Sequence, residues 1–131
     1  MHLIDTNIFL ELLLDQNKKK KAHEILTQVE TGELEVVISG FSLHSIEFIL
    51  CVKKKYDILR DFLLALNEFP NVSIYHTTLE EDLKILEIVD RTSLDFDDAN
   101  QYYIAKKFNA ELITFDKDFK IIKDVKVRIL K

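Results

Sequence analysis

Short, mostly β-branched runs alternate with longer amphipathic segments along this chain of 131 residues. We expect strands at His2–Asp5, Glu35–Ser39, Val72–Tyr75, Glu111–Phe115 and Lys126–Ile129. The segments between them carry apolar residues at the i, i+3, i+4 and i+7 positions of helices. Strands that alternate with helices form right-handed β-α-β units, which build a parallel sheet between two layers of helices. The sequence therefore predicts a three-layer α/β/α sandwich with a parallel sheet.

The composition is that of an ordinary globular protein. Hydrophobic residues make up 47% and charged residues 31%, and no apolar run approaches the roughly 20 residues that span a bilayer. The length and the scarcity of glycine and proline favour one domain over residues 1–131. The opening MHLIDTN lacks the features of a signal peptide, so we expect a cytoplasmic protein that does not contact a membrane.

The lone cysteine, Cys51, excludes an internal disulfide and a cysteine-rich zinc site. It lies in Phe41–Val52, a stretch so uniformly apolar that we expect a deeply buried helix with Cys51 in the core. Glu47 interrupts this stretch, and a buried carboxylate costs several kcal/mol unless it is paired or binds a metal. Its partner is expected to be a metal or a lysine such as Lys53 or Lys54, unless the side chain reaches solvent.

Acidic residues follow two of the expected strands and begin one helix. Asp5 ends the first strand, Asp116 follows Glu111–Phe115, and Asp98 lies in the first turn of a helix whose cap is Asp95 or Ser93. Parallel strands present their carboxyl ends at one edge, where open α/β sheets place ligands. Asp5 and Asp116 can therefore meet if their strands are neighbours. Asp95 is assigned mainly to capping, whereas Asp97 and Asp118 stay open as site or surface residues.

Carboxylates that converge would repel one another and take up protons unless cations lay between them. Oxygen ligands without cysteine favour Mg²⁺ or Mn²⁺, and such ions promote hydrolysis of phosphodiesters. The net charge of −5 argues against nucleic-acid binding through overall basicity. Three lysine groups, Lys18–Lys21, Lys53–Lys55 and Lys106–Lys107, are either contacts to RNA phosphates or solvated helix faces.

The order of these motifs resembles the PIN (PilT N-terminal) domain family, and especially its small VapC-type toxins. The motifs are DTN at Asp5, an acid in an apolar helix at Glu47, DA at Asp98–Ala99 and TxD at Thr114–Asp116. The resemblance implies a five-stranded parallel sheet of order 3-2-1-4-5. It also implies that the catalytic, metal-binding acids are Asp5, Glu47, Asp98 and Asp116, with Asn7 and Thr114 as supporting residues.

The expected function is that of a Mg²⁺- or Mn²⁺-dependent endoribonuclease acting on an RNA substrate. The resemblance implies the toxin of a toxin–antitoxin pair, a homodimer neutralised by a small antitoxin protein. One alternative is a non-catalytic PIN-fold module that binds RNA or protein, and another is a phosphatase for small phosphate esters. His44 stands between Ser42 and Ser45, but without a nucleophile-elbow glycine pattern it is expected to be a surface or capping residue.

Overall fold

All residues from 1 to 131 are described by the computed structural model, which contains one parallel sheet of order β3-β2-β1-β4-β5. This order confirms the expected topology. Along the chain the elements are β1 (His2–Ile4), α1 (Thr6–Leu13), α2 (Lys19–Glu30), β2 (Val36–Ser39), α3 (Gly40–Val52), α4 (Tyr56–Glu68), β3 (Val72–Tyr75), α5 (Leu79–Arg91), α6 (Phe96–Phe108), β4 (Glu111–Thr114), the 3-10 helix η1 (Lys117–Ile121) and β5 (Val127–Ile129).

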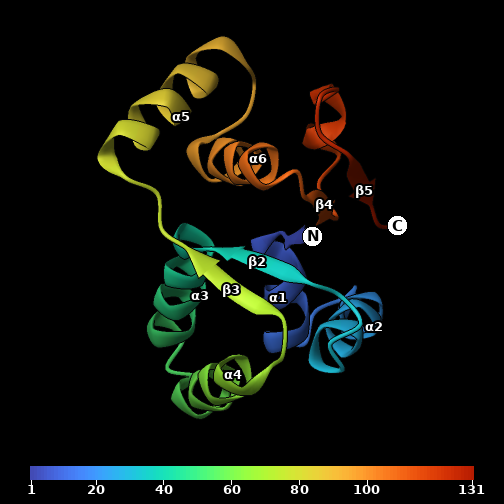
Figure 1. Ribbon diagram of the computed structural model, residues 1–131. Coiled ribbons are helices and arrows are strands. Elements are labelled where there is room, and N and C mark those ends of the chain that lie inside the picture. Colours follow the sequence, from blue (N-terminus) through green and yellow to red (C-terminus); the bar gives the residue numbers. More distant parts are fainter.

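Helices cover both faces of the sheet (Figure 1). Successive strand residues point to opposite faces, so each central strand feeds two apolar cores. Ile4 of β1 packs with α1 to α4, whereas its neighbour Leu3 packs with α5 and α6. In β4, Ile113 packs in the same core as Ile4, and Leu112 packs in the same core as Leu3. β1 and β4 are therefore buried on both sides, and their carboxyl ends lie between the two helical layers.

Local signals in the sequence fix several helix ends. Thr78 accepts a hydrogen bond from the Glu81 backbone while the Glu81 carboxylate accepts one from the Thr78 N–H, a complete capping box at the start of α5. Asp95 accepts a hydrogen bond from the Asp98 N–H at 2.8 Å, which confirms it as the cap of α6. Gly32 follows α2 with a φ of +80°, a conformation that favours glycine.

The prediction that Phe41–Val52 is deeply buried was wrong. In α3 the side chains of Phe48 and Val52 are 64% and 66% exposed, and Cys51 is exposed rather than in the core. The helix packs one side against α1, α4 and the sheet, and its outer side has no covering layer. When a helix is apolar on every side, its sequence does not indicate which side packs against the rest of the protein. No helix of the chain combines the length and apolar character needed to cross a membrane.

Candidate functional site

Asp5 lies at the carboxyl end of β1 and is held there by side chains from two neighbouring elements. Thr114 at the end of β4 donates a hydrogen bond to Oδ2 at 2.6 Å, and Gln101 of α6 donates one to Oδ1 at 2.9 Å. The residue is only 2% exposed. Burial raises the pKa of Asp5, and these hydrogen bonds partly oppose that effect. The carboxylate is therefore fixed in place but lacks a balancing cation.

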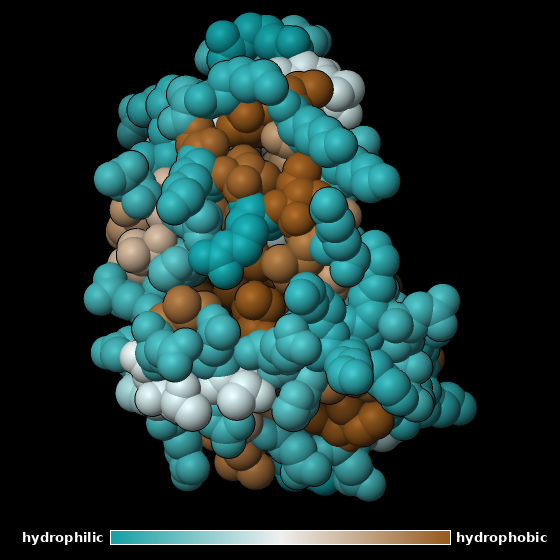
Figure 2. Space-filling view, turned by 90° about the vertical axis from the view of Figure 1, so that its right-hand side faces the viewer, coloured by the Kyte–Doolittle hydropathy of each residue, from teal (hydrophilic) through white to brown (hydrophobic).

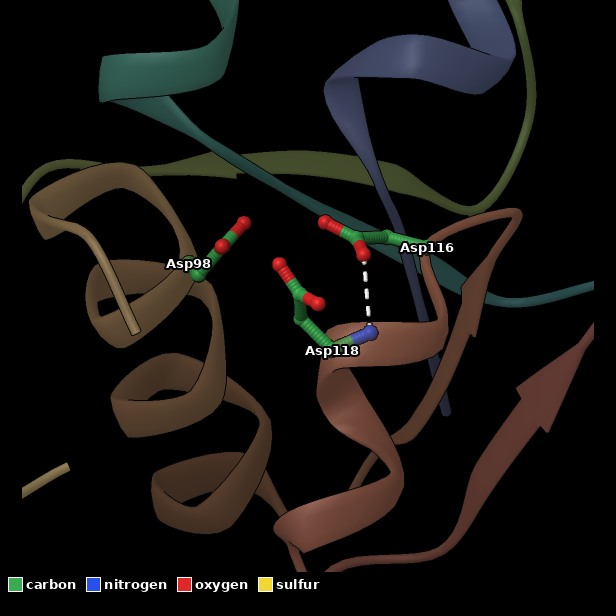
Figure 3. Close-up of side chains that lie close together, drawn as sticks. All are labelled: Asp98, Asp116 and Asp118. Atoms are coloured by element: carbon green, nitrogen blue, oxygen red, sulfur yellow. Dashed lines mark hydrogen bonds between the residues drawn. The ribbon is translucent and has the colours of Figure 1, made fainter. Parts of the chain in front are cut away.

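Three further carboxylates gather beside this strand end (Figure 3). Asp98, Asp116 and Asp118 each offer an oxygen atom, and these oxygens all lie within 4.8 Å of one another. Asp98 comes from the first turn of α6, whereas Asp116 follows β4 and Asp118 belongs to η1. The Asp118 N–H donates a hydrogen bond to Asp116 at 2.8 Å, which turns the chain so that both carboxylates face Asp98.

The carboxylates at this edge of the sheet concentrate negative charge, and none of them has an ion-pair partner. Burial, and then the charges of Asp95, Asp116, Asp5 and Asp97, raise the pKa of Asp98 to about 7. Burial is also the main reason that the pKa of Asp97 rises to about 6. None of the site carboxylates has a lysine, arginine or histidine nitrogen within 4.0 Å.

The family of the chain follows from its sequence as a whole. The sequence profile of the PIN domain matches residues 2–125. The chain belongs to the PIN domain family. No protein of curated function matches it in a sequence search.

Solved structures share the fold of this PIN domain at low sequence identity. A toxin–antitoxin complex from Klebsiella pneumoniae has 23% identity and a TM-score of 0.72, with 95% of each chain covered. VapC20 from Mycobacterium tuberculosis, a toxin that cleaves the sarcin-ricin loop, has 17% identity and a TM-score of 0.76, with 96% of this chain and 99% of that chain covered. VapBC2 from Rickettsia felis, bound to promoter DNA, has 18% identity and a TM-score of 0.74 over 99% and 98% of the two chains.

Gln101 is a buried residue of the PIN domain site that the sequence analysis missed. Its amide nitrogen bridges Asp5 and Asp97, at 2.9 and 3.1 Å, and the residue has no exposed surface. Its carbonyl oxygen Oε1 is buried without a hydrogen-bond partner. The available signal was an amide on α6 one turn after Asp97, on the side that also carries Ala105 and Ile104. A buried amide there needs polar partners.

A second set of buried hydroxyls ties the helices together behind the carboxylates. Thr6 of α1 donates a hydrogen bond to Ser42 of α3 at 2.7 Å, and the Ser42 N–H donates one to Ser39 at 3.3 Å. Ser39 in turn donates to Asn100 of α6. These contacts connect the layers on opposite faces of the sheet, because α6 lies on one face and α1 and α3 on the other.

The structure brings Asp5, Asp98 and Asp116 together but leaves Glu47 outside their cluster. The Glu47 side chain is 33% exposed, and its Oε1 lies 2.8 Å from Nδ1 of His44 on the same helix. The neighbour of this carboxylate is thus a histidine, not Lys53 or Lys54. Asn7 is exposed, and the Asp5 side chain accepts no cap hydrogen bond from the first turn of α1, where Asn7 lies.

The chemistry of this donor set fits a divalent metal ion. All the converging atoms are carboxylate oxygens, which suit hard ions such as Mg²⁺ and Mn²⁺. No basic side chain pairs with them within 4.0 Å, and burial together with the neighbouring carboxylates raises the pKa of Asp98 to about 7. Asp98 and Asp116 are half-buried and Asp118 is exposed, so the cluster is open to solvent on the Asp118 side.

Proposed function

We propose that this PIN domain is a metal-dependent endoribonuclease that hydrolyses RNA phosphodiester bonds. The observation that carries the proposal is the group of Asp98, Asp116 and Asp118, whose oxygens lie within 4.8 Å of one another beside buried Asp5 and have no basic nitrogen within 4.0 Å. The fold shared with toxins, one of which is named as cleaving the sarcin-ricin loop, supports RNA as the substrate class.

In this proposal Asp98, Asp116 and Asp118 would hold Mg²⁺ or Mn²⁺, with Asp5 as a further ligand. A bound ion supplies Lewis-acid polarisation of the phosphodiester and lowers the pKa of water. Thr114 fixes the orientation of Asp5 through its hydroxyl, and the same hydroxyl accepts a hydrogen bond from the Asp116 N–H at 2.8 Å. Thr114 is therefore proposed to align Asp5, which follows β1, and Asp116, which follows the neighbouring strand β4, as ligands of the ion.

Glu47 remains a predicted ligand of this site. To reach it, the carboxylate would have to leave His44, since its present contact is within α3. An experiment on Glu47 therefore separates two roles. If Glu47→Gln lowers Mn²⁺ affinity, Glu47 is a ligand, and if it leaves affinity unchanged, the metal is held by the aspartates alone.

The proposed activity can be tested with labelled structured RNA and purified protein in Mg²⁺, Mn²⁺ or EDTA. We expect cleavage by the wild type with either ion, none in EDTA, and a loss of at least 100-fold in Asp5→Asn and Asp98→Asn. Asp90→Asn is the matched control, because Asp90 is an exposed aspartate of α5 outside the site. Equal cutting by the wild type and Asp5→Asn would refute the assignment of the site, and a wild type that cuts with neither ion would leave a non-catalytic binding module.

We also propose that the chain is the toxin of a toxin–antitoxin pair and binds a small antitoxin protein. The name of one structural neighbour describes such a complex. An apolar groove of about 380 Å³ between α1, α2 and α4, lined by Phe9, Leu26 and Phe62 among others, offers a surface for a partner. Coexpression with a small protein encoded next to this chain should inhibit cleavage and give a stable complex on a sizing column.

The proposed homodimer has a candidate surface on α5. Leu79, Leu83 and Leu86 repeat at helical spacing and are 83%, 66% and 55% exposed. A soluble chain seldom leaves such a stripe uncovered. We expect light scattering to give twice the chain mass for the wild type and the monomer mass for Leu83→Lys. A monomeric wild type would contradict the dimer without affecting the nuclease assignment.

A further inference from the structure

Four lysines line one hollow at the carboxyl end of the sheet, next to the carboxylate site. The hollow has a volume of about 500 Å³ and lies between the N-terminus of α2, η1 and the end of β5. Its walls include Phe115 and Leu130, and its basic residues are Lys18, Lys117, Lys120 and Lys131. Figure 2 shows the molecule from the side of β5 and the C-terminus, where apolar residues lie between hydrophilic ones.

None of these four ammonium groups has a carboxylate within 4.0 Å, although five other lysines of the chain do. Lys18 instead lies over the ring of Phe115, with Nζ 4.9 Å from its centroid. The concentration of unpaired positive charge is unexpected in a chain of net charge −5. Like charges brought into one hollow repel one another, so the arrangement favours an anionic occupant.

A backbone hydrogen bond links the wall of the hollow to the strand that carries the carboxylate site. The Leu130 N–H donates a hydrogen bond of 2.8 Å to the carbonyl of Thr114, whose hydroxyl binds Asp5. Lys117 directly follows Asp116 in the chain and opens η1, which also carries Asp118. The aspartates and the lysine hollow therefore lie at the carboxyl ends of neighbouring strands, β4 and β5.

We propose that this hollow binds the phosphates of the RNA backbone that flank the bond to be cut. The inference rests on the proposed nuclease function and extends it to substrate binding. Lysine ammonium groups act as point charges toward phosphate oxygens, and contacts of this kind position a nucleic acid without reading its sequence. The hollow thus supplies affinity and direction, with the phosphate chain running from the ends of β1 and β4 toward β5.

RNA binding measured at several salt concentrations tests the hollow directly. The probe is a 12-nucleotide fluorescein-labelled single-stranded RNA in EDTA, which withholds the metal and keeps the RNA intact. We expect the triple variant Lys18→Gln, Lys120→Gln and Lys131→Gln to bind at least 10-fold more weakly at 100 mM salt. A plot of the logarithm of the RNA association constant against the logarithm of the salt concentration should become less steep by about 2. Each lysine contact with a single strand contributes roughly 0.7 to this slope, and the variant lacks three lysines.

The matched control carries the same loss of charge at Lys84, Arg91 and Lys123, which are exposed, lie outside the hollow and form no ion pair. It should keep the wild-type slope. Equal affinity and slope in the two triple variants would overturn the proposal. Binding of polyglutamate that depends on the same three lysines, with no such dependence for RNA, would also overturn it and assign the hollow to an acidic protein.

A small diester separates this inference from the nuclease proposal. Bis(4-nitrophenyl) phosphate has no flanking phosphates, so its Mn²⁺-dependent hydrolysis does not need the hollow. We expect the triple hollow variant to hydrolyse it like the wild type while its KM for RNA rises. A wild type that hydrolyses neither compound would refute the nuclease proposal, and the binding measurement with labelled RNA would still decide whether the hollow binds RNA.

Discussion

Replacing Asp98 by asparagine should stabilise the metal-free protein while removing its response to Mn²⁺. The variant keeps the shape of the side chain and removes the charge whose pKa is raised to about 7 by burial and four neighbouring aspartates. A rise from 3.8 to about 7 corresponds to about 4 kcal/mol, at 1.36 kcal/mol for each pH unit. The side chain is half-exposed, so solvent screening reduces this to about 1–2 kcal/mol.

The loss of an acid from the first turn of α6 opposes part of this gain, by about 0.3–1 kcal/mol. The net increase in the free energy of unfolding at pH 8 is therefore about 1 kcal/mol, or roughly 4 °C in Tm for a chain of this size. The stability difference between Asp98→Asn and the wild type depends on pH. The pKa of Asp98 is higher in the folded protein than in the unfolded chain, so protonated Asp98 stabilises the wild type fully below the unfolded pKa near 4. This contribution is lost as the pH rises through about 7.

Differential scanning fluorimetry in EDTA at pH 5 and pH 8 measures this effect. The free energy of unfolding of Asp98→Asn should exceed that of the wild type at pH 8 and match it at pH 5. That of Asp90→Asn should stay within about 0.5 kcal/mol of the wild type at both pH values. Mn²⁺ should then raise the Tm of the wild type and of Asp90→Asn but not that of Asp98→Asn, because an intact folded site binds the ion. A variant less stable than the wild type in EDTA at pH 8 would refute the electrostatic reasoning.

Three further predictions concern other parts of the chain. Thr114→Val should lower the free energy of unfolding in urea by about 1–3 kcal/mol, because buried Asp5 loses a hydrogen bond of 2.6 Å, and a loss below 0.5 kcal/mol would contradict this. Tyr75→Phe removes the bond that does most to hold the pKa of Glu81 at about 2, so the Glu81 pKa measured by NMR should rise toward 4.5. Exposed Cys51 should react with a thiol reagent in the native protein within minutes, whereas protection until unfolding would show that it is covered.

The fold was predictable because its signals are local and repeated. Each short β-branched run became a strand, and the capping box at Thr78 and the cap at Asp95 begin helices where the pattern indicates. Burial in α3 was not predictable in this way. Phe48 is as apolar as any core residue, and only the positions of the other layers show that its side of the helix is uncovered.

Part of the site was likewise predictable. Asp5, Asp98 and Asp116 could be placed at one edge because parallel strands end together. The position of Asp118 depends on a 3-10 turn whose N–H bonds to Asp116, a detail that the letters DKD do not specify. Gln101 reaches Asp5 across 96 positions of sequence, and Glu47 takes a partner only three positions away, so tertiary packing decides which polar groups meet.

The hydrogen bond between Thr114 and Asp5 joins residues 109 positions apart, and this separation controls when the site can exist. Closing a loop of that length costs about 4 kcal/mol of chain entropy, which is recovered only when β1 pairs with β4. A growing polypeptide that has not yet released β4 from the ribosome lacks the partner of Asp5 as well as Asp116 and Asp118. The proposed nuclease can therefore assemble only after β4 and the two aspartates that follow it have left the ribosome, and a shorter nascent chain has no complete site with which to cut RNA.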